Sequence, residues 1–290
     1  MRRIPFLATS FLVFVITFKL DPYDHMVVFE NDESRQNTTI GKNNTEENIV
    51  NRFSVPEGYE RVRVDSLSFA HYLRLLPLKP IGATVYYFDG RTKPNHNIYE
   101  AVVDLPIGQR DLHQCADAIM RLRAEYLYFQ KKYDSIHFNF TNGFRADYSK
   151  WKKGQRLSVK GSTVSWVSSA APSSSYKDFW KYLEVVFSYA GTASLEQELE
   201  SAQLEDLKIG DIFIQGGFPG HAVIVVDLAK HKTTGDTIFL LAQSYMPAQE
   251  IQILKNPKDS NLSPWYTTSK IKNELYTPEW VFKKAHLRRF

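Results

Sequence analysis

A helix-forming segment followed much later by a block of short apolar strands is the feature that most limits how this chain can fold. Residues 111–132 are rich in helix formers, and residues 211–254 contain four β-branched or aromatic runs bounded by Gly, Pro or Lys-rich turns. Helices first and strands last predict an α+β fold, in which an antiparallel sheet packs on the 111–132 helix, rather than alternating β-α-β units. The apolar residues of that helix recur at spacings of three and four, so they share one face: Leu112, Cys115, Ile119, Leu122, Tyr126 and Phe129.

The remaining elements are expected to be short. Asp111 and Gln114 form a capping pattern that predicts the start of the long helix at residue 111. The polar residues Asp117, Arg121 and Glu125 are spaced by four on its other face. The sequence also predicts helices over 66–76 and 176–190, a third helix capped by Ser194, a hairpin joining 83–88 to 99–104, a loop over 161–175, and strands over 211–214, 221–226, 237–243 and 250–254.

The N-terminus has the residue order of an export signal. Arg2 and Arg3 precede an apolar run over residues 4–18, which Lys19 and Asp21 close. We therefore expect residues 1–20 to be either a cleaved signal peptide or an uncleaved membrane anchor, with the bulk of the chain in the periplasm, the cell envelope or the extracellular space. Residues 21–52 are polar and lack a hydrophobic period, which predicts a flexible tether that contributes nothing to the core.

Composition excludes several classes of function. With 36 Lys and Arg against 32 Asp and Glu, the net charge is only +4 and no dense basic block is present, so no nucleic-acid partner is expected. The single cysteine, Cys115, excludes an intramolecular disulfide and CxxC-type sites. A metal site built from His113, Cys115 and His221 would lack any recognised zinc spacing, so no metal and no cofactor are expected.

Cys115 is the first candidate for chemistry. It lies in the first turn of the predicted helix, where unpaired backbone N–H groups and the helix dipole favour a thiolate. A nucleophile paired there with a histidine would have a pKa well below the free value of about 8.5. The alternative is that Cys115 is a small buried hydrophobic residue, whose pKa desolvation would raise.

His221 is the candidate base. It follows the loop Gly216-Gly217-Phe218-Pro219-Gly220 and begins the apolar strand AVIVV, so its imidazole is expected at the end of a strand beside a loop that a ligand can approach closely. The next strand ends at Gln243 and Ser244, either of which can orient the second ring nitrogen. We choose Gln243 as the third member of a Cys-His-polar triad. The alternative for His221 is a structural residue at a strand edge.

Several segments resemble a family of exported proteins of unknown function. These are VPEGYERV (55–62), YLRLLPLKP (72–80), DLHQCADAIMRLRAEYLYF (111–129), GDIFIQGGFPGHAVIVVD (210–227) and TPEWVF (277–282). They look like domain-of-unknown-function family 4846, across most of residues 52–290. The resemblance implies a fold and a site more than a reaction. From the order of the elements we expect a single α+β domain over residues 53–290.

At a greater distance the layout is similar to the NlpC-type and CHAP-type cysteine peptidases of the papain-like superfamily. That resemblance implies a papain-like sheet packed on a Cys-bearing helix, with the roles of nucleophile, base and third residue falling on Cys115, His221 and Gln243. It also implies an oxyanion-hole or substrate-binding glutamine, for which Gln109 and Gln114 are the candidates. Cys115 stands in a Gln-Cys-Ala context instead of the usual one, and its long separation from His221 requires an insertion over about 135–200.

Two functions follow from these observations. The first is an exported thiol peptidase or amidase acting on a peptide or peptidoglycan-like substrate, with residues 4–18 as the membrane tether if the N-terminal segment is not cleaved. The second is a catalytically inert extracytoplasmic binding module on the same fold. In the second case Trp166, Trp180, Trp265 and Tyr266 are the candidates to line a sugar or peptide groove.

Overall fold

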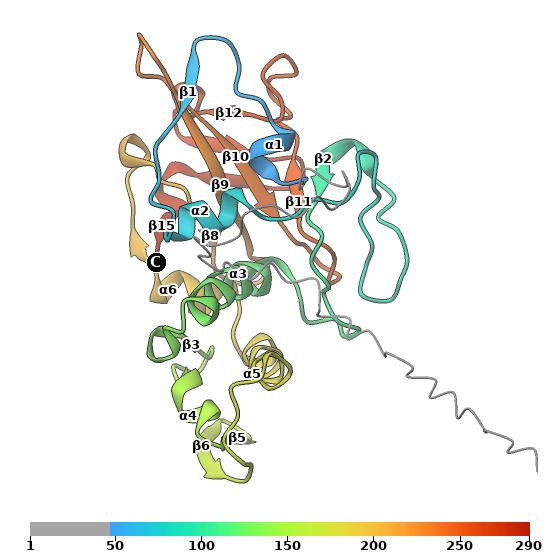
Figure 1. Ribbon diagram of the computed structural model, residues 1–290, viewed down its shortest axis with the longest axis vertical. Helices are drawn as coiled ribbons and strands as arrows, with labels where there is room; N and C mark the ends of the chain where they lie inside the picture. The colour runs from blue at the N-terminus through green and yellow to red at the C-terminus, as the bar shows by residue number, and fades with distance from the viewer. Residues whose placement is uncertain (1–46) are drawn as a thin grey trace, which may run out of the picture. The chain divides into compact units, whose positions relative to one another are not determined.

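A large antiparallel sheet dominates the computed structural model, which describes residues 47–290. The sheet has the order β2-β11-β10-β9-β8-β15-β7, with β1 added to β9 and β12 added to β10 (Figure 1). All strand pairs of this sheet within residues 47–290 are antiparallel, and helices are few, which confirms an α+β fold. Its strands are β1 (Tyr59–Arg61), β2 (Tyr99–Val102), β7 (Glu200–Ser201), β8 (Ile212–Gln215), β9 (His221–His231), β10 (Thr237–Gln243), β11 (Gln252–Leu254), β12 (Tyr266–Thr267) and β15 (Leu287–Arg289).

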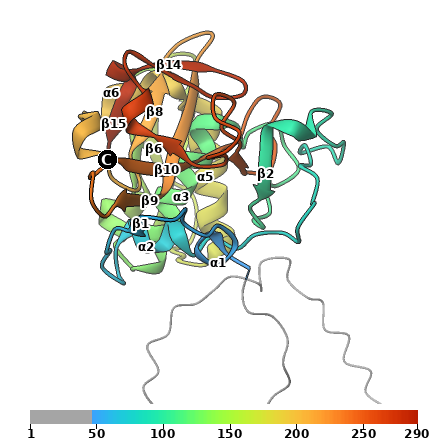
Figure 2. The same ribbon diagram turned by 90° about the horizontal axis from the view of Figure 1, so that it is seen from above.

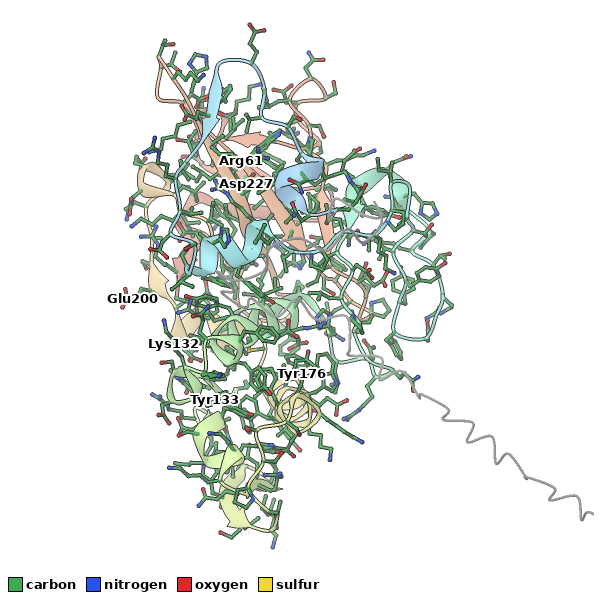
Figure 3. All side chains as sticks on the ribbon, in the orientation of Figure 1. Arg61, Lys132, Tyr133, Tyr176, Glu200 and Asp227 are labelled. Atoms are coloured by element: carbon green, nitrogen blue, oxygen red, sulfur yellow. The ribbon has the colours of Figure 1, made fainter. Side chains whose placement is uncertain are left out.

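Strand β9 forms the middle of this sheet. Its first nine residues are buried, because β8, β10 and β1 pair along its edges while helices and loops cover its faces. The strand is longer than the predicted 221–226 and continues to His231. Asp227, near its middle, is buried and accepts hydrogen bonds from Arg61 and Arg74 at 2.7 and 2.6 Å (Figure 3). This strand therefore holds His221 at one end of a rigid element.

Helix α3 (Cys115–Phe129) packs against β9, as the order of the elements predicts. It begins four residues later than the predicted start at Asp111. The Asp117 carboxylate accepts the backbone N–H of Gln114 at 3.0 Å, so Gln114 is the N-cap, while Asp111 accepts from the Gln114 side chain instead. Cys115 is consequently the first residue of the helix.

The second face of α3 is also buried, contrary to the polar pattern of Asp117, Arg121 and Glu125. The segment from residue 133 to 198, close to the expected insertion, lies on the side of α3 away from the sheet (Figure 1). It leaves Arg121 and Glu125 each about 1% exposed. This segment contains η2 (Tyr133–Ser135), β3 (His137–Asn139), β4 (Arg145–Asp147), α4 (Tyr148–Lys152), β5 (Gln155–Lys160), β6 (Thr163–Ser168), α5 (Tyr176–Tyr189) and α6 (Thr192–Glu198).

The end of the predicted tether belongs to the fold. Asn48 caps the short helix α1 (Ile49–Arg52), and Ile49 is fully buried in the main core. Leu78 donates its backbone N–H to Glu47 at 2.7 Å, which ties this segment to the chain after α2 (Phe69–Arg74). The prediction that residues up to 52 add nothing to the core is therefore wrong for 47–52. Residues 1–46, with the signal or anchor and most of the tether, lie outside the described residues.

Three further predictions differ from the structure. Residues 83–88 form only isolated bridges, and β2 pairs with β11 instead of with them. Part of the serine-rich loop 161–175 forms β6, whose hairpin partner β5 supplies its hydrogen bonds. Ser194 is the third residue of α6, whose N-cap is Gly191, and its hydroxyl accepts the N–H of Gly191 at 3.0 Å.

The last part of the chain returns over the sheet. The hairpin of β13 (Glu274–Tyr276) and β14 (Val281–Lys283) contacts β8, and it precedes η5 (Lys284–His286) and β15. Figure 2 shows the opposite edge, where β2 follows η1 (His96–Ile98) at the end of an extended segment. The remaining short helices are η3 (Leu204–Asp206) and η4 (Thr268–Lys270). Within residues 47–290, every helix is too short or too polar to cross a membrane.

Candidate functional site

The end of β10 positions the first turn of α3. The Ser244 hydroxyl lies 2.8 Å from the carbonyl oxygens of both His113 and Gln249, so it ties the residues before α3 to the chain leaving β10. This attachment brings Cys115 beside the start of β9, where the backbone N–H of Ala222 hydrogen-bonds its sulfur. The Ser244 hydroxyl is therefore engaged by backbone oxygens, and the side chain that contacts His221 is the neighbouring Gln243.

His221 and Gln243 are directly hydrogen-bonded. Because Ala242 pairs with Ile224, these two side chains lie diagonally on the same face of neighbouring strands. The Nε2 atom of His221 lies 2.8 Å from Oε1 of Gln243. Cys115, His221 and Gln243, the three predicted triad residues, therefore lie at one end of the β9–β10 pair.

Aromatic rings enclose the His221 imidazole. Ring centroids lie 4.6 Å away for Tyr245, 5.4 Å for Trp280 and 5.8 Å for Phe282. The pKa of His221 is lowered to about 4, mainly by this burial. The Gln243 hydrogen bond opposes the shift, and the nearby Lys93 ammonium contributes to it. The imidazole is therefore neutral at pH 7.

The Cys115 thiol is only 5% exposed. Burial raises its pKa to about 11, and the Asp117 carboxylate adds to that shift. The backbone N–H groups of Ala116, Ala222 and Cys115 itself act in the opposite direction, but they do not outweigh burial. The direction of this shift is the one expected for a buried, packed cysteine and not the lowering expected for a thiol paired with a histidine at a helix start. The thiol and the imidazole are both neutral.

Two charged residues that the sequence analysis did not select complete the site. Gln243 donates its side-chain N–H to Glu279 Oε2 at 2.6 Å, and Lys93 donates to the same oxygen at 2.8 Å. Lys93 also donates to Gln249 Oε1 at 3.0 Å. Glu279 lies in the turn between β13 and β14, within the TPEWVF segment. The resemblance of that segment to the family was the sequence signal that could have indicated Glu279. Lys93 had none.

A cavity of about 200 Å³ opens at Cys115. Its walls are the first turn of α3, the first turn of α6, the loop 217–220 and Met246. Gln114 lines it, although its side-chain amide donates to Asp111 at 3.0 Å. Gln109 lies in an exposed bend and is not among the lining residues, so of the two predicted glutamines only Gln114 faces the cavity.

The glycine loop before β9 forms one wall of this cavity. A Cβ on Gly220 would lie 2.3 Å from Thr192 Oγ1 and 2.5 Å from the Gly217 carbonyl oxygen, so only glycine fits. At the loop tip Phe218 is fully exposed, and Met246 across the cavity is 49% exposed. The mouth of the cavity therefore offers apolar surface to a ligand.

His113 does not join this site. Its Nδ1 lies 3.4 Å from the Gln249 carbonyl oxygen, and its Nε2 lies 3.5 Å from the Arg121 guanidinium. Within residues 47–290, no group of three or more His, Cys, Asp or Glu side chains is arranged to hold a metal ion.

The four aromatic residues predicted for a binding groove lie in different environments. Trp166 packs on Phe144, Trp180 stacks with the Arg121 guanidinium, and Trp265 and Tyr266 are each 3% exposed. They are core or packing residues of separate regions and do not share one groove.

Comparison with protein families agrees with the close resemblance. The model described as domain of unknown function (4846) matches residues 49–289. The chain belongs to this family. The match begins at Ile49, the first residue of α1, which agrees with the inclusion of that helix in the fold. No curated protein and no solved structure is significantly similar to the chain.

Proposed function

We propose that this protein is a cysteine hydrolase that cleaves amide bonds of cell-wall-type peptides, with Cys115 as nucleophile, His221 as base and Gln243 as the residue that orients the base. The single observation that supports it most is the position of the only thiol of the chain. Cys115 is the first residue of α3 and lines a cavity, and its sulfur is hydrogen-bonded by the backbone of Ala222, next to a histidine that is bonded to Gln243. A thiol, an imidazole and an orienting amide are the groups that covalent acyl transfer requires.

The proposal includes the distant relationship. A Cys-bearing helix packed on an antiparallel sheet, with the histidine opening a strand and the glutamine closing the next, fits a papain-like fold of the NlpC or CHAP type. The segment 133–198 then corresponds to an insertion that covers the helix.

The neutral thiol and imidazole define how the reaction begins. When the substrate enters, His221 accepts the thiol proton as the sulfur attacks the carbonyl carbon of the substrate. The amine leaves with that proton, and a thioester on Cys115 remains. Water, deprotonated by the same imidazole, then releases the acid and restores the thiol.

The first turn of α3 supplies donors for the oxyanion. The N–H groups of Cys115 and Ala116 already approach the sulfur, and backbone N–H groups at a helix start stabilise developing negative charge. Gln114 would add a donor after releasing Asp111. In this proposal the oxyanion role belongs to the helix start and not to Gln109.

Trapping of the thioester tests the reaction. The full chain is incubated with p-nitrophenyl acetate and with soluble stem-peptide fragments of peptidoglycan, and the products are followed by mass spectrometry. We expect an acetyl group on Cys115 that hydroxylamine removes, and release of a fragment from the peptides. Both signals should disappear in Cys115→Ala and fall by about 100-fold or more in His221→Asn. Asp178→Asn, in the distant α5, is the control.

The binding module remains the second candidate, because burial raises the thiol pKa and lowers the imidazole pKa. It predicts that p-nitrophenyl acetate leaves Cys115 unmodified in folded protein, while peptide fragments bind with the same affinity in wild type and Cys115→Ala. Such a result would favour the binding module and contradict the proposed hydrolase.

Export is part of the proposal. The order of residues 1–20 supports secretion or anchoring outside the cytoplasm, where cell-wall peptides occur. Fractionation of cells that produce the full chain, with a tag at the C-terminus, tests it. Recovery in the cytoplasmic fraction would contradict this part.

A further inference from the structure

We propose that Glu279 is a positioning residue: it fixes the orientation of the Gln243 amide and thereby places the proton of neutral His221 on Nε2, leaving Nδ1 as the basic atom. The significance for catalysis rests on the proposed function, but the assignment of the proton does not.

The argument starts from the carboxylate. Glu279 Oε2 accepts hydrogen bonds from Gln243 Nε2 at 2.6 Å and from Lys93 Nζ at 2.8 Å. An ionised carboxylate has no proton to donate, so the group of Gln243 that faces it must be the NH₂ end of the amide. The orientation of this amide is therefore set by chemistry and not by an arbitrary choice between two similar atoms.

The other end of the amide then determines the imidazole. With its nitrogen toward Glu279, Gln243 presents its oxygen to His221 Nε2 at 2.8 Å. That oxygen only accepts, so Nε2 must carry the proton. A neutral imidazole with its proton on Nε2 has its lone pair on Nδ1.

Lys93 makes the carboxylate necessary. The Lys93 ammonium is 3% exposed and, like an amide NH₂, can only donate. Without Glu279 between them, Lys93 and the Gln243 NH₂ group would face each other as two donors. The amide would then turn its oxygen toward Lys93 and its NH₂ toward His221, which would move the imidazole proton to Nδ1.

The TPEWVF segment (277–282) contains none of the proposed triad residues, but it contributes Glu279 and Trp280 to their surroundings. Glu279 lies in a turn closed by hydrogen bonds between Thr277 and Trp280, in which Thr277 N donates to the Trp280 carbonyl oxygen at 2.9 Å. The ring of Trp280 packs beside His221. The TPEW turn therefore supplies both the acceptor for Gln243 and part of the cover over the imidazole.

Nitrogen NMR of the imidazoles tests the proposal directly. The full chain is labelled with ¹⁵N-histidine, His221 is assigned by the loss of its signals in His221→Asn, and the protonated nitrogen is identified at pH 7. We expect Nε2 to carry the proton in wild type. In Glu279→Ala we expect the proton on Nδ1, and in Glu279→Gln we expect it again on Nε2, since the amide oxygen of the new glutamine can accept from both donors.

Asp178→Ala is the matched control, because Asp178 also accepts from a cation, Arg156, at 2.9 Å but lies in α5. It should leave His221 unchanged. A wild-type His221 with its proton on Nδ1 overturns the proposal without any variant, which protects the test if Glu279→Ala does not fold. A folded Glu279→Ala with the proton still on Nε2 overturns it as well.

The test of the Glu279 proposal and the test of the proposed hydrolase can fail independently. If wild type and the two variants show the expected protons but no thioester forms on Cys115, the positioning role stands and the proposed function fails. If a thioester forms, we expect its rate to fall by about 100-fold or more in Glu279→Ala and to recover in Glu279→Gln, as loss of a general base predicts.

Discussion

Two buried polar clusters meet where His113 Nδ1 lies 3.4 Å from the Gln249 carbonyl oxygen, and they differ in how they end. The sealed cluster contains Arg121 and Glu125 of α3 with Tyr72, Tyr176 and His113. The site cluster contains His221, Gln243, Glu279, Lys93 and Gln249. Both combine a buried cation with a carboxylate and hydrogen-bonding neighbours.

In the sealed cluster the carboxylate is saturated by hydrogen bonds. Glu125 accepts from Arg121 at 2.9 Å, from Tyr72 at 3.1 Å and from Tyr176 at 2.5 Å, and Arg121 also donates to the Pro106 carbonyl oxygen. The hydrogen bonds of the site cluster instead end at the His221 imidazole, next to Ala222, whose backbone N–H bonds the Cys115 sulfur. The comparison teaches that buried charge alone does not mark a site: what distinguishes the second cluster is that it lies next to the thiol, on which the proposed function rests.

The largest expected effect concerns the sealed cluster. Arg121→Met leaves Glu125 buried without its cation, so we expect a loss of about 3–5 kcal/mol in the free energy of unfolding. Lys93→Met should cost less than half as much, because the Glu279 side chain is 21% exposed and water can solvate it. Unfolding in urea measures both. Equal losses would show that the site cluster is as structural as the sealed one.

The next largest effect is the pH dependence of folding stability that His221 causes. The pKa of His221 is lowered to about 4 by burial, below the 6.5 of an unfolded histidine, so between pH 6.5 and 4 the unfolded chain binds a proton that the folded chain does not. Stability should therefore fall as the pH falls through this window, by about 3 kcal/mol from His221.

His221→Asn should remove that part of the slope and leave the part from His113, whose pKa is lowered to about 3 by burial and by Arg121. Urea unfolding at a series of pH values provides the test. A constant difference between wild type and variant across the window would contradict the buried, neutral imidazole.

A smaller effect is expected in the glycine loop before His221, which forms one wall of the cavity. Gly220→Ala places a Cβ against Thr192 and two carbonyl oxygens, so we expect a loss of about 1–3 kcal/mol and a distorted wall beside Cys115. Gly191→Ala, on the same rim, meets nothing within 4 Å and should cost less than about 1 kcal/mol. Thermal unfolding of both variants compares them, and similar losses would argue against a tightly packed loop.

The smallest change in stability separates binding from folding. Phe218 is fully exposed, so Phe218→Ala should change the free energy of unfolding by less than about 0.5 kcal/mol. If the loop tip contacts substrate, the KM for peptidoglycan fragments should rise while kcat is retained. An unchanged KM would remove Phe218 from the substrate surface.

The sequence analysis predicts the fold class well because periodicity reports directly on buried faces. The strand Thr237–Gln243 has its predicted bounds, and β9 has its predicted start. The sequence analysis is wrong where contacts with a distant segment override a local pattern. The run 83–88 is rich in strand formers, but β11 pairs with β2 instead, and the polar stripe of α3 is buried because the segment 133–198 covers it.

For the site, local signals locate residues but not their ionisation. The helix start of Cys115 and the strand start of His221 were readable, as was the polar end of β10 at Gln243. The raised pKa of the thiol was not, because helix position predicts the opposite shift and only the packed structure reveals the burial. Glu279 and Lys93 were missed since each becomes relevant only through a contact 36 or 186 positions away.

Those separations also govern when the site forms. The bond between Lys93 and Glu279 joins residues 186 positions apart, and the last strand of the main sheet, β15, ends at Arg289. Contacts of such long range form slowly, because much of the chain must be ordered before they close. A chain still emerging from a ribosome therefore lacks the partner of Gln243 until Glu279 has been synthesised, so folding itself delays the assembly of the His221–Gln243–Glu279 hydrogen bonds.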